Sequence, residues 1–415
     1  MWGTIENFHF QSYRLKCRLC GGMKEKMGNA LIIASVASMI DQFNRSNIKI
    51  LQGLGYHVDV ACNYIEGSTC TKERIEDLKR NLKDLRVNYF QIDFARNVTN
   101  FKQNRRAYQQ LKVLAKKKHY NLVHCHAPIS GVLGRIVFQN ERKQGTAVIY
   151  TAHGFHFFQG APLKNWILYY PVEKFLSRWT DCLITINKED YKRAKKKFYA
   201  KRTEYVPGVG IDLRKIAETN VDRKKKRREL GISEDAFFIL SVGELSKRKN
   251  HKLILQALCN LKNEKICYVI CGQGALENEL KEFVWNYGLE KNVQFLGYRS
   301  DVLELYKSAD LFVFPSLQEG LPVALMEAMA SGVPCVASDI RGNRDLLGKE
   351  MKRNLIRLEE PESWKNHILY CIHHIKEETQ RAEKYQKKME RFSEEKIEIR
   401  MREIYQLYLD SIPFV

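Results

Sequence analysis

Short apolar runs alternate with helical stretches along most of the chain after residue 27. Residues 29–38 form an apolar run of strand length, residues 48–55 have helical spacing, and residues 57–63 alternate like a second strand. A longer amphipathic helix is predicted over 105–120. Further strands are expected at 121–126, 147–153 and 181–187. Because strands that alternate with helices form parallel sheets, this half of the chain predicts a doubly wound α/β fold.

The same alternation starts again after residues 206–213, where glycines and a proline lie close together and indicate an interdomain linker. Strands are predicted at 236–244, 266–274, 292–297, 309–316 and 333–339. The chain therefore predicts two similar α/β domains, 27–207 and 213–392, followed by a helical segment over 393–415. The segment 222–230 is expected to be a solvated basic cluster beside the linker.

Residues 1–26 lack the period of a helix or a strand and contain no apolar core of a signal peptide. Cys17 and Cys20 form a CxxC pair, but no second pair follows at the spacing of a zinc site. We therefore expect residues 1–26 to be a leader that is disordered or not native, with translation starting at Met27.

Composition narrows the possible classes of protein. A chain of 415 residues is long enough for two cores, and it contains no run of roughly 18 uncharged apolar residues that would span a bilayer. The 11 cysteines show no framework spacing, which favours reduced thiols in a cytoplasmic protein. Most of the net charge of +21 lies in residues 27–212, which hold 30 Lys and Arg against 15 Asp and Glu. Such a basic half favours anionic lipid head groups, a pyrophosphate-bearing acceptor or nucleic acid as a partner.

A turn followed by a short helix, at 315–334, is the most specific sign of chemistry. The strand before it places residues 318–322 at the carboxyl end of a parallel sheet, where such folds bind ligands. Gly320 allows the backbone to approach a ligand, and the free N–H groups at the helix start favour a diphosphate. Glu327 is suited to accept both hydroxyl protons of a ribose, and Glu319 lies closer to the group that the diphosphate carries. The spacing thus predicts a nucleotide-sugar site.

These residues resemble the signature of retaining glycosyltransferases of family 4, whose GT-B fold has two Rossmann-like domains that face each other across a cleft. The signature is the E-x7-E pair of Glu319 and Glu327 within that turn and helix. Residues 241–251, 269–274 and 295–310 resemble three further donor-side segments of the family, and the resemblance covers essentially all of the chain from Met27. The segments that resemble bacterial exopolysaccharide and capsule enzymes are 123–135, 149–157 and 160–191.

The resemblance implies a role for individual residues and a UDP-sugar donor that carries a hexose or an N-acetylhexosamine. Lys249 would stabilise the charge that develops on the diphosphate, Glu319 would contact the donor sugar, and His126 would lie near the reacting carbon. The other donor-side positions are Glu327 for the ribose, the backbone of Gly320, Leu321 and Pro322 for the phosphates, Tyr298 and Arg299 for the base, and Gly243, Arg248, Gly272 and Gly274 in the cleft. His153 and Trp166 are assigned to the acceptor side. By position alone, either histidine also fits a structural role at a strand end.

One position departs from the family pattern, because Glu244 stands where the family usually has an arginine. A carboxylate repels phosphate, so three outcomes are open. Either Arg248 or Lys247 supplies the missing charge, or Glu244 turns away from the site, or the diphosphate is held more weakly. We favour the first, because both cations belong to the same short loop.

No D-x-D sequence occurs in the chain, so we expect no metal cofactor and a diphosphate held by a helix dipole and Lys249. The resemblance implies retention of anomeric configuration. Since no carboxylate nucleophile is evident, we expect a front-face displacement in which the leaving phosphate helps to deprotonate the acceptor.

Residues 162–179 interleave aromatic side chains with Lys and Arg, a composition suited to the head-group region of a membrane. The alternative is an ordinary pair of amphipathic helices, kinked at Pro171, that covers the sheet. With the basic first half, the segment favours a peripheral enzyme on the inner face of the cytoplasmic membrane that extends a saccharide on polyprenyl diphosphate. Residues 27–207 would then bind this acceptor, residues 213–392 the donor, and the helix over 393–415 would cross back to the first domain.

Three other functions stay open. The charge motivates a nucleic-acid-binding protein, although the motifs argue against nucleic acid as a partner. A hydrolysing nucleotide-sugar epimerase of the same fold would release UDP without an acceptor. A non-catalytic sensor of nucleotide sugars is conceivable because of Glu244.

Overall fold

The computed structural model describes residues 28–67, 70–261, 265–358 and 360–409. The leader lies outside these residues, and the predictions about Cys17, Cys20 and Met27 lie outside them too. The chain divides into two compact units, one formed by the residues up to Ile149 together with those from Met401, and the other by Tyr150–Arg400.

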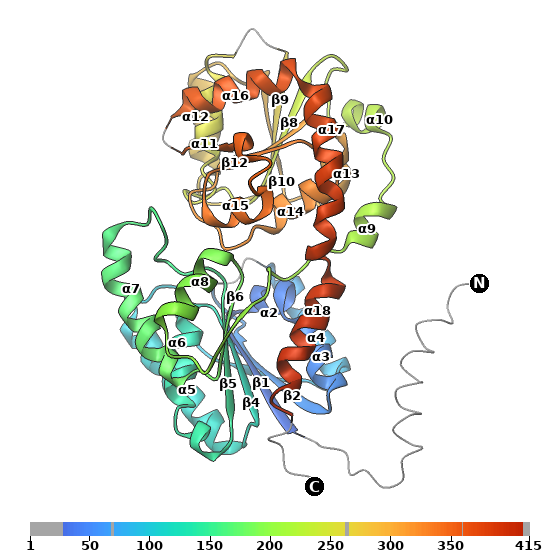
Figure 1. The fold of residues 1–415 in the computed structure, drawn as a ribbon. Coiled ribbons are helices and arrows are strands. Elements are labelled where there is room, and N and C mark those ends of the chain that lie inside the picture. Colours follow the sequence, from blue (N-terminus) through green and yellow to red (C-terminus); the bar gives the residue numbers. More distant parts are fainter. Residues whose placement is uncertain (1–27, 68–69, 262–264, 359, 410–415) are drawn as a thin grey trace, which may run out of the picture. The chain divides into compact units, whose positions relative to one another are not determined.

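The first sheet has seven strands in the order β3-β2-β1-β4-β5-β6-β7 (Figure 1). The strands are β1 (Gly28–Val36), β2 (Tyr56–Asn63), β3 (Asn88–Gln91), β4 (Leu122–His126), β5 (Ala147–Ala152), β6 (Cys182–Thr185) and β7 (Arg202–Tyr205). β1 pairs in parallel with β2 and with β4, so the chain crosses over between strands through helices. This order confirms the predicted doubly wound sheet.

Helices separate these strands along the chain, as the alternating pattern predicts. They are α2 (Ala37–Phe43), α3 (Arg45–Gly53), α4 (Lys72–Asp84), α5 (Phe101–Lys117), α6 (Pro128–Val137), α7 (Leu163–Leu176) and α8 (Lys188–Lys197), with short 3-10 turns η1 (Glu141–Gln144) and η2 (Ser177–Trp179). α4 shows why such segments are helical: the side chain of Thr71 accepts the N–H of Arg74 at its start, and its buried positions share one face.

The second sheet has six strands in the order β10-β9-β8-β11-β12-β13 (Figure 1). The strands are β8 (Phe237–Val242), β9 (Ile266–Cys271), β10 (Val293–Gly297), β11 (Leu311–Phe314), β12 (Cys335–Ser338) and β13 (Leu355–Ile356). The other elements of this half and of the C-terminal segment are α9 (Leu213–Glu218), α10 (Arg223–Glu229), α11 (His251–Leu258), α12 (Glu277–Asn286), α13 (Val302–Ser308), α14 (Val323–Ala330), α15 (Arg341–Leu347), η3 (Lys352–Asn354), α16 (Pro361–His373), α17 (Ile375–Gln386), η4 (Lys387–Phe392) and α18 (Glu394–Gln406).

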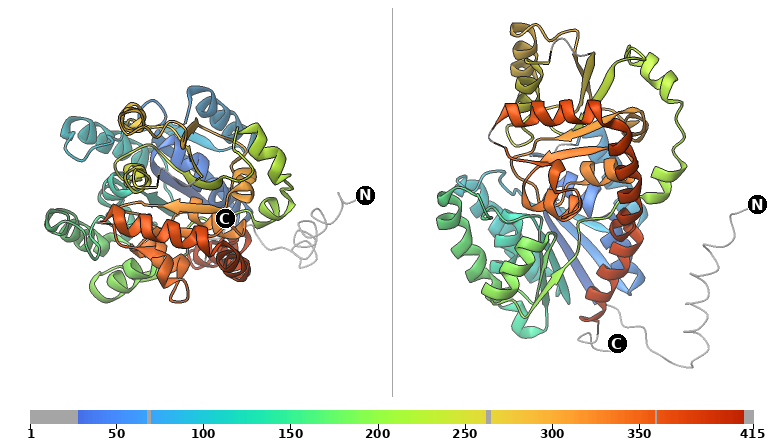
Figure 2. Two further views of the ribbon diagram at one scale, coloured as in Figure 1. Left: turned by 90° about the horizontal axis from the view of Figure 1, so that it is seen from above. Right: turned by 45° about the horizontal axis from the view of Figure 1, so that its top comes forward.

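Two apolar clusters cover the two faces of this second sheet. Along β8, Phe238 and Leu240 join the cluster that contains α13 and α14, whereas Ile239 between them joins the cluster that contains α11 and α16. Successive side chains of a strand point to opposite faces, so a strand buried on both faces is apolar throughout. α16 and α17 run over this sheet in clearly different directions (Figure 2).

Two local predictions need correction. The basic segment 222–230 is not fully solvated, because in α10 the Arg227 side chain is 9% exposed and pairs with Asp310. Residues 162–179 contain one α-helix with Pro171 inside it rather than a pair of helices. The segment 206–213 packs closely at Gly210, where a Cβ would lie 2.6 Å from Glu394 Cα, and its assignment as an interdomain linker stays a prediction.

Two further observations concern the described residues as a whole. None of their helices combines the length and the apolar character that crossing a bilayer would require. Their nine cysteines form no disulfide.

Candidate functional site

The loop that follows β11 brings Glu319 against two cations from the loop that follows β8. Glu319 Oε1 accepts hydrogen bonds from Lys249 Nζ at 2.8 Å and from Arg248 Nη1 at 2.6 Å. The Lys249 side chain is 12% exposed and the Glu319 side chain 9%, whereas that of Arg248 is 45% exposed. Burial lowers the pKa of Lys249, and the charge of Glu319 opposes this shift. Two cations therefore share one oxygen of Glu319, and the charge of Glu244 also acts on Lys249 and opposes the lowering of its pKa.

The backbone fixes this cluster from two adjacent strands. The N–H of Leu317 donates to the carbonyl of Arg248 at 2.8 Å, so the two loops are tied directly to each other. Asn250 caps α11 in the left-handed region, with φ of 56°. Lys249 Nζ also lies 4.5 Å from the ring centroid of Phe314, a residue of β11. Strand ends and a strained turn thus position Lys249, whereas the sequence motif alone gives only its approximate place.

Gly243, Gly272 and Gly274 lie where two neighbouring strand ends cross closely. A Cβ on Gly272 would lie 1.9 Å from the carbonyl oxygen of Gly243, and a Cβ on Gly274 would lie 2.4 Å from that of Leu245. Gly243 and Gly272 also have positive φ values of 156° and 150°. Close backbone approach explains these glycines, and their predicted contact with a donor stays a prediction.

Gly320 is required by the crowding of main chains around the predicted diphosphate turn. A Cβ at Gly320 would lie 2.2 Å from the carbonyl oxygen of His153, and a Cβ at Gly342 would lie 2.5 Å from the carbonyl oxygen of Gly320. Leu321 is buried, and Pro322 precedes α14 as its N-cap with φ of −80° and ψ of 120°. The turn therefore enters α14 with its main chain held from two sides.

Arg341 and Asp190 support this turn, and neither was predicted as a site residue. Arg341 Nη1 donates to Asp190 Oδ1 at 2.7 Å, Nη2 to the carbonyl of Phe155 at 2.6 Å, and Nε to the carbonyl of Glu319 at 3.2 Å. The two side chains are 2% and 0% exposed. Asp190 also accepts the N–H of Phe155 at 2.9 Å. A buried ion pair thus anchors the carbonyl of the residue whose side chain meets Lys249.

Glu327 lies on α14 and has a different hydrogen-bond partner from Glu319. Its Oε2 accepts the Tyr306 hydroxyl at 3.4 Å, and burial raises the pKa of its carboxyl group while Tyr306 and Lys215 oppose the rise. Tyr298 is 71% exposed. Arg299 donates to both oxygens of Asp301, at 2.8 and 2.5 Å, and this pairing together with Lys226 lowers the pKa of Asp301 to about 2. The assigned roles in ribose and base binding stay predictions.

His126 belongs to the other unit and ends β4. It is 2% exposed, and its ring centroid lies 4.0 Å from that of His124. His124 Nδ1 lies 2.7 Å from the hydroxyl of Tyr405. The next residue, Ala127, has φ of 70° and ψ of 159°, a conformation that side-chain-bearing residues rarely adopt. His126 thus occupies an ordered polar site, and its contact with an acceptor stays a prediction.

The two residues assigned to the acceptor side differ in their surroundings. Burial lowers the pKa of His153 to about 4, so its ring is neutral at pH 7. Trp166 packs on Phe157 with ring centroids 5.7 Å apart and lies under Arg193 at 4.8 Å. These contacts explain Trp166 through packing, and they leave its predicted acceptor role untested.

Two further sequence predictions concern Glu244 and the independence of a metal. Glu244 is exposed, and Arg248 of the same loop reaches Glu319. Within the described residues, no three His, Cys, Asp or Glu side chains form a group that could hold a metal ion. The predicted independence of a metal remains a prediction.

Comparisons with known proteins agree on the class of this chain. The profile described as "Glycosyl transferases group 1" matches residues 222–389, and the profile of "Glycosyltransferase Family 4" matches residues 47–215. Glycosyltransferase EpsD of Bacillus subtilis is 38% identical over 312 residues, which cover 74% of this chain and 82% of EpsD. The chain therefore belongs to the family 4 glycosyltransferases, as its motifs predicted.

Two further similarities refine this result. The UDP-Gal:alpha-D-GlcNAc-diphosphoundecaprenol alpha-1,3-galactosyltransferase of Escherichia coli is 32% identical over 289 residues, 68% of this chain and 73% of that enzyme. The crystal structure of Anabaena HepE in complex with UDP and glucose has a TM-score of 0.71 and 20% identity, and the match covers 91% of this chain and 99% of HepE. The fold is thus the GT-B fold.

Proposed function

We propose that this glycosyltransferase moves a hexose or an N-acetylhexosamine from a UDP-sugar, with retention of configuration, to a saccharide linked to polyprenyl diphosphate in polysaccharide biosynthesis. The E. coli relative, by its name, uses UDP-galactose and an acceptor on diphosphoundecaprenol. That relative supports both the donor class and the acceptor class. The enzyme would work as a peripheral protein at the inner face of the cytoplasmic membrane.

The cluster of Lys249, Arg248 and Glu319 is the observation that carries this proposal. Both of its cations bond to the same oxygen of Glu319, so a single diphosphate can reach both of them. In the proposal a donor diphosphate takes over both cations, and this frees Glu319 to accept hydroxyl protons of the sugar. Arg248 then supplies the charge that Glu244 does not, which is the first of the three outcomes considered for that position.

The chemical step needs no residue as a nucleophile. The bond between the anomeric carbon and the diphosphate oxygen breaks, and its electron pair leaves with UDP. The acceptor hydroxyl oxygen bonds to the same face of that carbon, and its proton passes to a phosphate oxygen of UDP. Lys249, whose side chain is 12% exposed, stabilises the charge that develops on this leaving group. The proposal includes no metal.

The outer face of α7 supports the peripheral placement. Its exposed apolar side chains are Leu163 at 73%, Ile167 at 65%, Leu168 at 61%, Val172 at 44% and Phe175 at 49%. Lys164, Lys174 and Arg178 lie in the same segment, so apolar and cationic groups are combined as an anionic lipid surface requires. An Ile167→Ser and Leu168→Ser double variant should lose binding to vesicles that contain phosphatidylglycerol. Unchanged binding would contradict the assignment of this face.

The transfer reaction is tested with a panel of UDP-sugars, in the presence and absence of a polyprenyl-diphosphate-linked saccharide. Release of UDP that depends on the acceptor supports the transferase. Turnover without an acceptor would instead identify the epimerase, and nucleotide binding without turnover would identify the sensor. Proton NMR of the product reports whether the anomeric configuration is retained.

A matched pair of lysine variants connects the reaction to the cluster. Lys249→Gln should lower turnover by roughly 100- to 1,000-fold, because a preorganised charge at the leaving group is lost. Lys252→Gln serves as the control, since Lys252 lies nearby on α11 and pairs with Glu279 at the surface. A Lys249→Gln enzyme that folds correctly and turns over like the control would refute the assigned role.

A further inference from the structure

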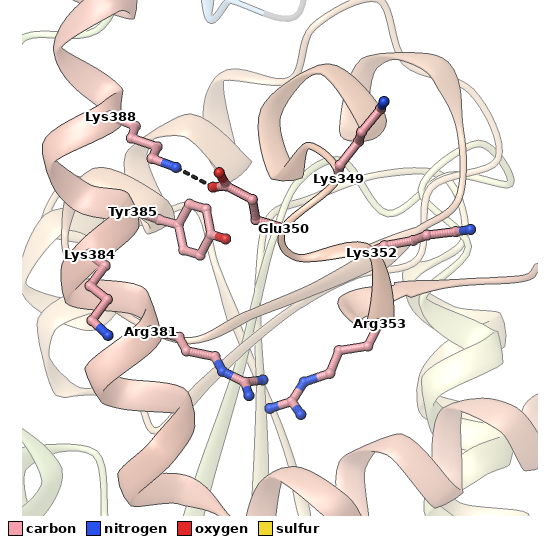
Figure 3. A pocket seen from close by; sticks show the side chains of 8 residues that line it. All are labelled: Lys349, Glu350, Lys352, Arg353, Arg381, Lys384, Tyr385 and Lys388. Atoms are coloured by element: carbon pink, nitrogen blue, oxygen red, sulfur yellow. Dashed lines mark hydrogen bonds and ion pairs between the residues drawn. The ribbon is translucent and has the colours of Figure 1, made fainter.

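A hollow of about 380 Å³ lies between the segment after α15 and helix α17 (Figure 3). This volume falls within the range of small-ligand sites. Six cationic side chains and a single carboxylate line it, and none of these residues is assigned to the donor or the acceptor. The lining consists of Lys349, Glu350, Lys352, Arg353, Arg381, Lys384, Tyr385 and Lys388.

One buried carboxylate holds two of the arginines at this hollow. The Glu378 side chain is 1% exposed, and its Oε1 accepts hydrogen bonds from both Arg353 and Arg381. Its Oε2 accepts from Asn354 Nδ2 at 2.9 Å, so the carboxylate itself is fixed. The guanidinium of Arg353 also lies 4.7 Å from the ring centroid of Tyr370. The positions of both guanidinium groups are therefore set by the fold.

These two guanidinium groups are oriented to bind a shared ligand. Figure 3 shows their ends pointing toward each other, whereas Lys349 and Lys352 point away from them. A guanidinium group has five N–H donors, and the bond to Glu378 uses one donor of each arginine. An acceptor with several oxygens can therefore bridge Arg353 and Arg381.

The cationic side chains that line the hollow outnumber the carboxylates that pair with them. Lys388 pairs with Glu350, and this pairing, together with the Tyr385 hydroxyl, lowers the pKa of Glu350. Glu378 carries one negative charge against two arginines. Within the described part of the chain, Lys349, Lys352 and Lys384 form no ion pair. Divalent anions are therefore favoured at this hollow over neutral ligands.

We infer that this hollow is a second anion site, which binds a phosphate group through Arg353 and Arg381 with Lys384 at its rim. Paired guanidinium groups match the oxygens of a phosphate bidentately, and a carboxylate offers fewer acceptors. Inorganic phosphate, a soluble phosphate ester and a phospholipid head group share this chemistry. The inference concerns binding alone and does not depend on the proposed transfer reaction.

Titration calorimetry with inorganic phosphate tests this site in the full chain at low ionic strength, with saturating UDP to occupy the donor site. Arg381→Gln should weaken phosphate binding at least about tenfold, because a charged hydrogen-bond donor is lost. Glu378 keeps Arg353 and Asn354 as partners in this variant. Lys376→Gln is the control, since Lys376 is exposed on the same helix but does not line the hollow. If Arg381→Gln fails to fold, Lys384→Gln replaces it, with an expected loss of at least about threefold.

A second arm separates a soluble source of phosphate from a lipid source. The same variants are sedimented with vesicles of phosphatidylcholine, with and without 30% phosphatidic acid, a composition chosen for roughly physiological surface charge. Loss of calorimetric binding supports a soluble ligand, and loss of sedimentation with phosphatidic acid alone supports a lipid head group. If Arg381→Gln, Lys384→Gln and Lys376→Gln behave alike in both arms, the inferred site is overturned.

Discussion

Replacing Arg341 tests whether the buried ion pair positions the loop that carries Glu319. The Arg341→Met change keeps an unbranched side chain of similar reach but removes its charge and its donors. Asp190, which is 0% exposed, then keeps neutral donors such as the Phe155 N–H, and the ion pair left to it, with Arg193 Nη1 at 3.9 Å, is beyond hydrogen-bonding distance. Breaking a buried pair by removing one partner costs about 3–5 kcal/mol, because the other charge stays buried without compensation.

The same helix contains a matched control for this change. Arg344 pairs with Asp339 at 2.6 Å, but the two side chains are 41% and 35% exposed. Such a surface pair contributes about 0–1 kcal/mol, so Arg344→Met should be nearly neutral. The chemistry of the two substitutions is identical, and burial is the main difference between them. The comparison therefore measures the cost of losing the buried cluster, which is the charge left on Asp190 together with the Phe155 and Glu319 carbonyls that lose a donor.

The measurement is thermal unfolding, combined with titration of UDP. For a unit of this size, 1 kcal/mol shifts Tm by about 2 °C or more, so Arg341→Met should lower Tm by at least about 6 °C. UDP affinity should fall as well, since the carbonyl of Glu319 loses a donor. An additional Asp190→Leu change should recover about 2 kcal/mol, because an apolar pair replaces an orphaned charge. A Tm within 2 °C of the Arg344→Met control, or strictly additive losses in the double variant, would refute this reasoning.

Three further predictions concern single positions. Gly320→Ala should lower turnover by about 100-fold. The new Cβ would lie 2.2 Å from the carbonyl oxygen of His153, so the loop must shift by about 1 Å. Gly53→Ala is the control, because the nearest atom to a Cβ at Gly53 is 3.8 Å away. Burial lowers the pKa of His251 to about 4, so protons bind preferentially to the unfolded chain below pH 6.5. The free energy of unfolding in urea should therefore fall between pH 8 and pH 5 by about 2 kcal/mol less in His251→Asn than in the unchanged protein, where His153 contributes a similar loss of its own; equal pH slopes would exclude this origin. Glu327→Gln should weaken UDP binding about tenfold but leave the affinity for 2′,3′-dideoxy-UDP unchanged, and an equal loss for both nucleotides would separate Glu327 from the ribose.

The central strands were predictable because burial on both faces makes them continuous apolar runs. β1, β8 and β9 are largely of this kind, and each lies inside its sheet. The short strands β3, β7 and β13 had no such signal, since each lies at a sheet edge and one of its faces needs no apolar cover. The sequence pattern thus identified the interior of the fold better than its margins.

The candidate site divides in the same way. Glu319, Gly320 and Glu327 were predictable because their spacing follows from one strand, one turn and one helix. Arg341 and Asp190 are 151 positions apart, and neither lies in a recognisable local pattern. Their pairing depends on tertiary packing alone. Residues that bind through local geometry can be found from the sequence, whereas residues that support them across the fold need coordinates.

Backbone strain gives an independent reason to regard His126 and Lys249 as functional. Among the described residues, the non-glycine positions with positive φ are Arg86, Ala127 and Asn250. Two of these directly follow a predicted site residue: Ala127 follows His126, and Asn250 follows Lys249. Such conformations cost of order 1–3 kcal/mol and persist only where the surrounding structure enforces them. Ala127 is a stronger case than Asn250. Its φ of 70° and ψ of 159° lie in a region that is essentially restricted to glycine. Alanine also has no side-chain hydrogen bond that could offset the strain. The fold therefore maintains an uncommon backbone conformation beside each of the two residues, whose roles stay predictions.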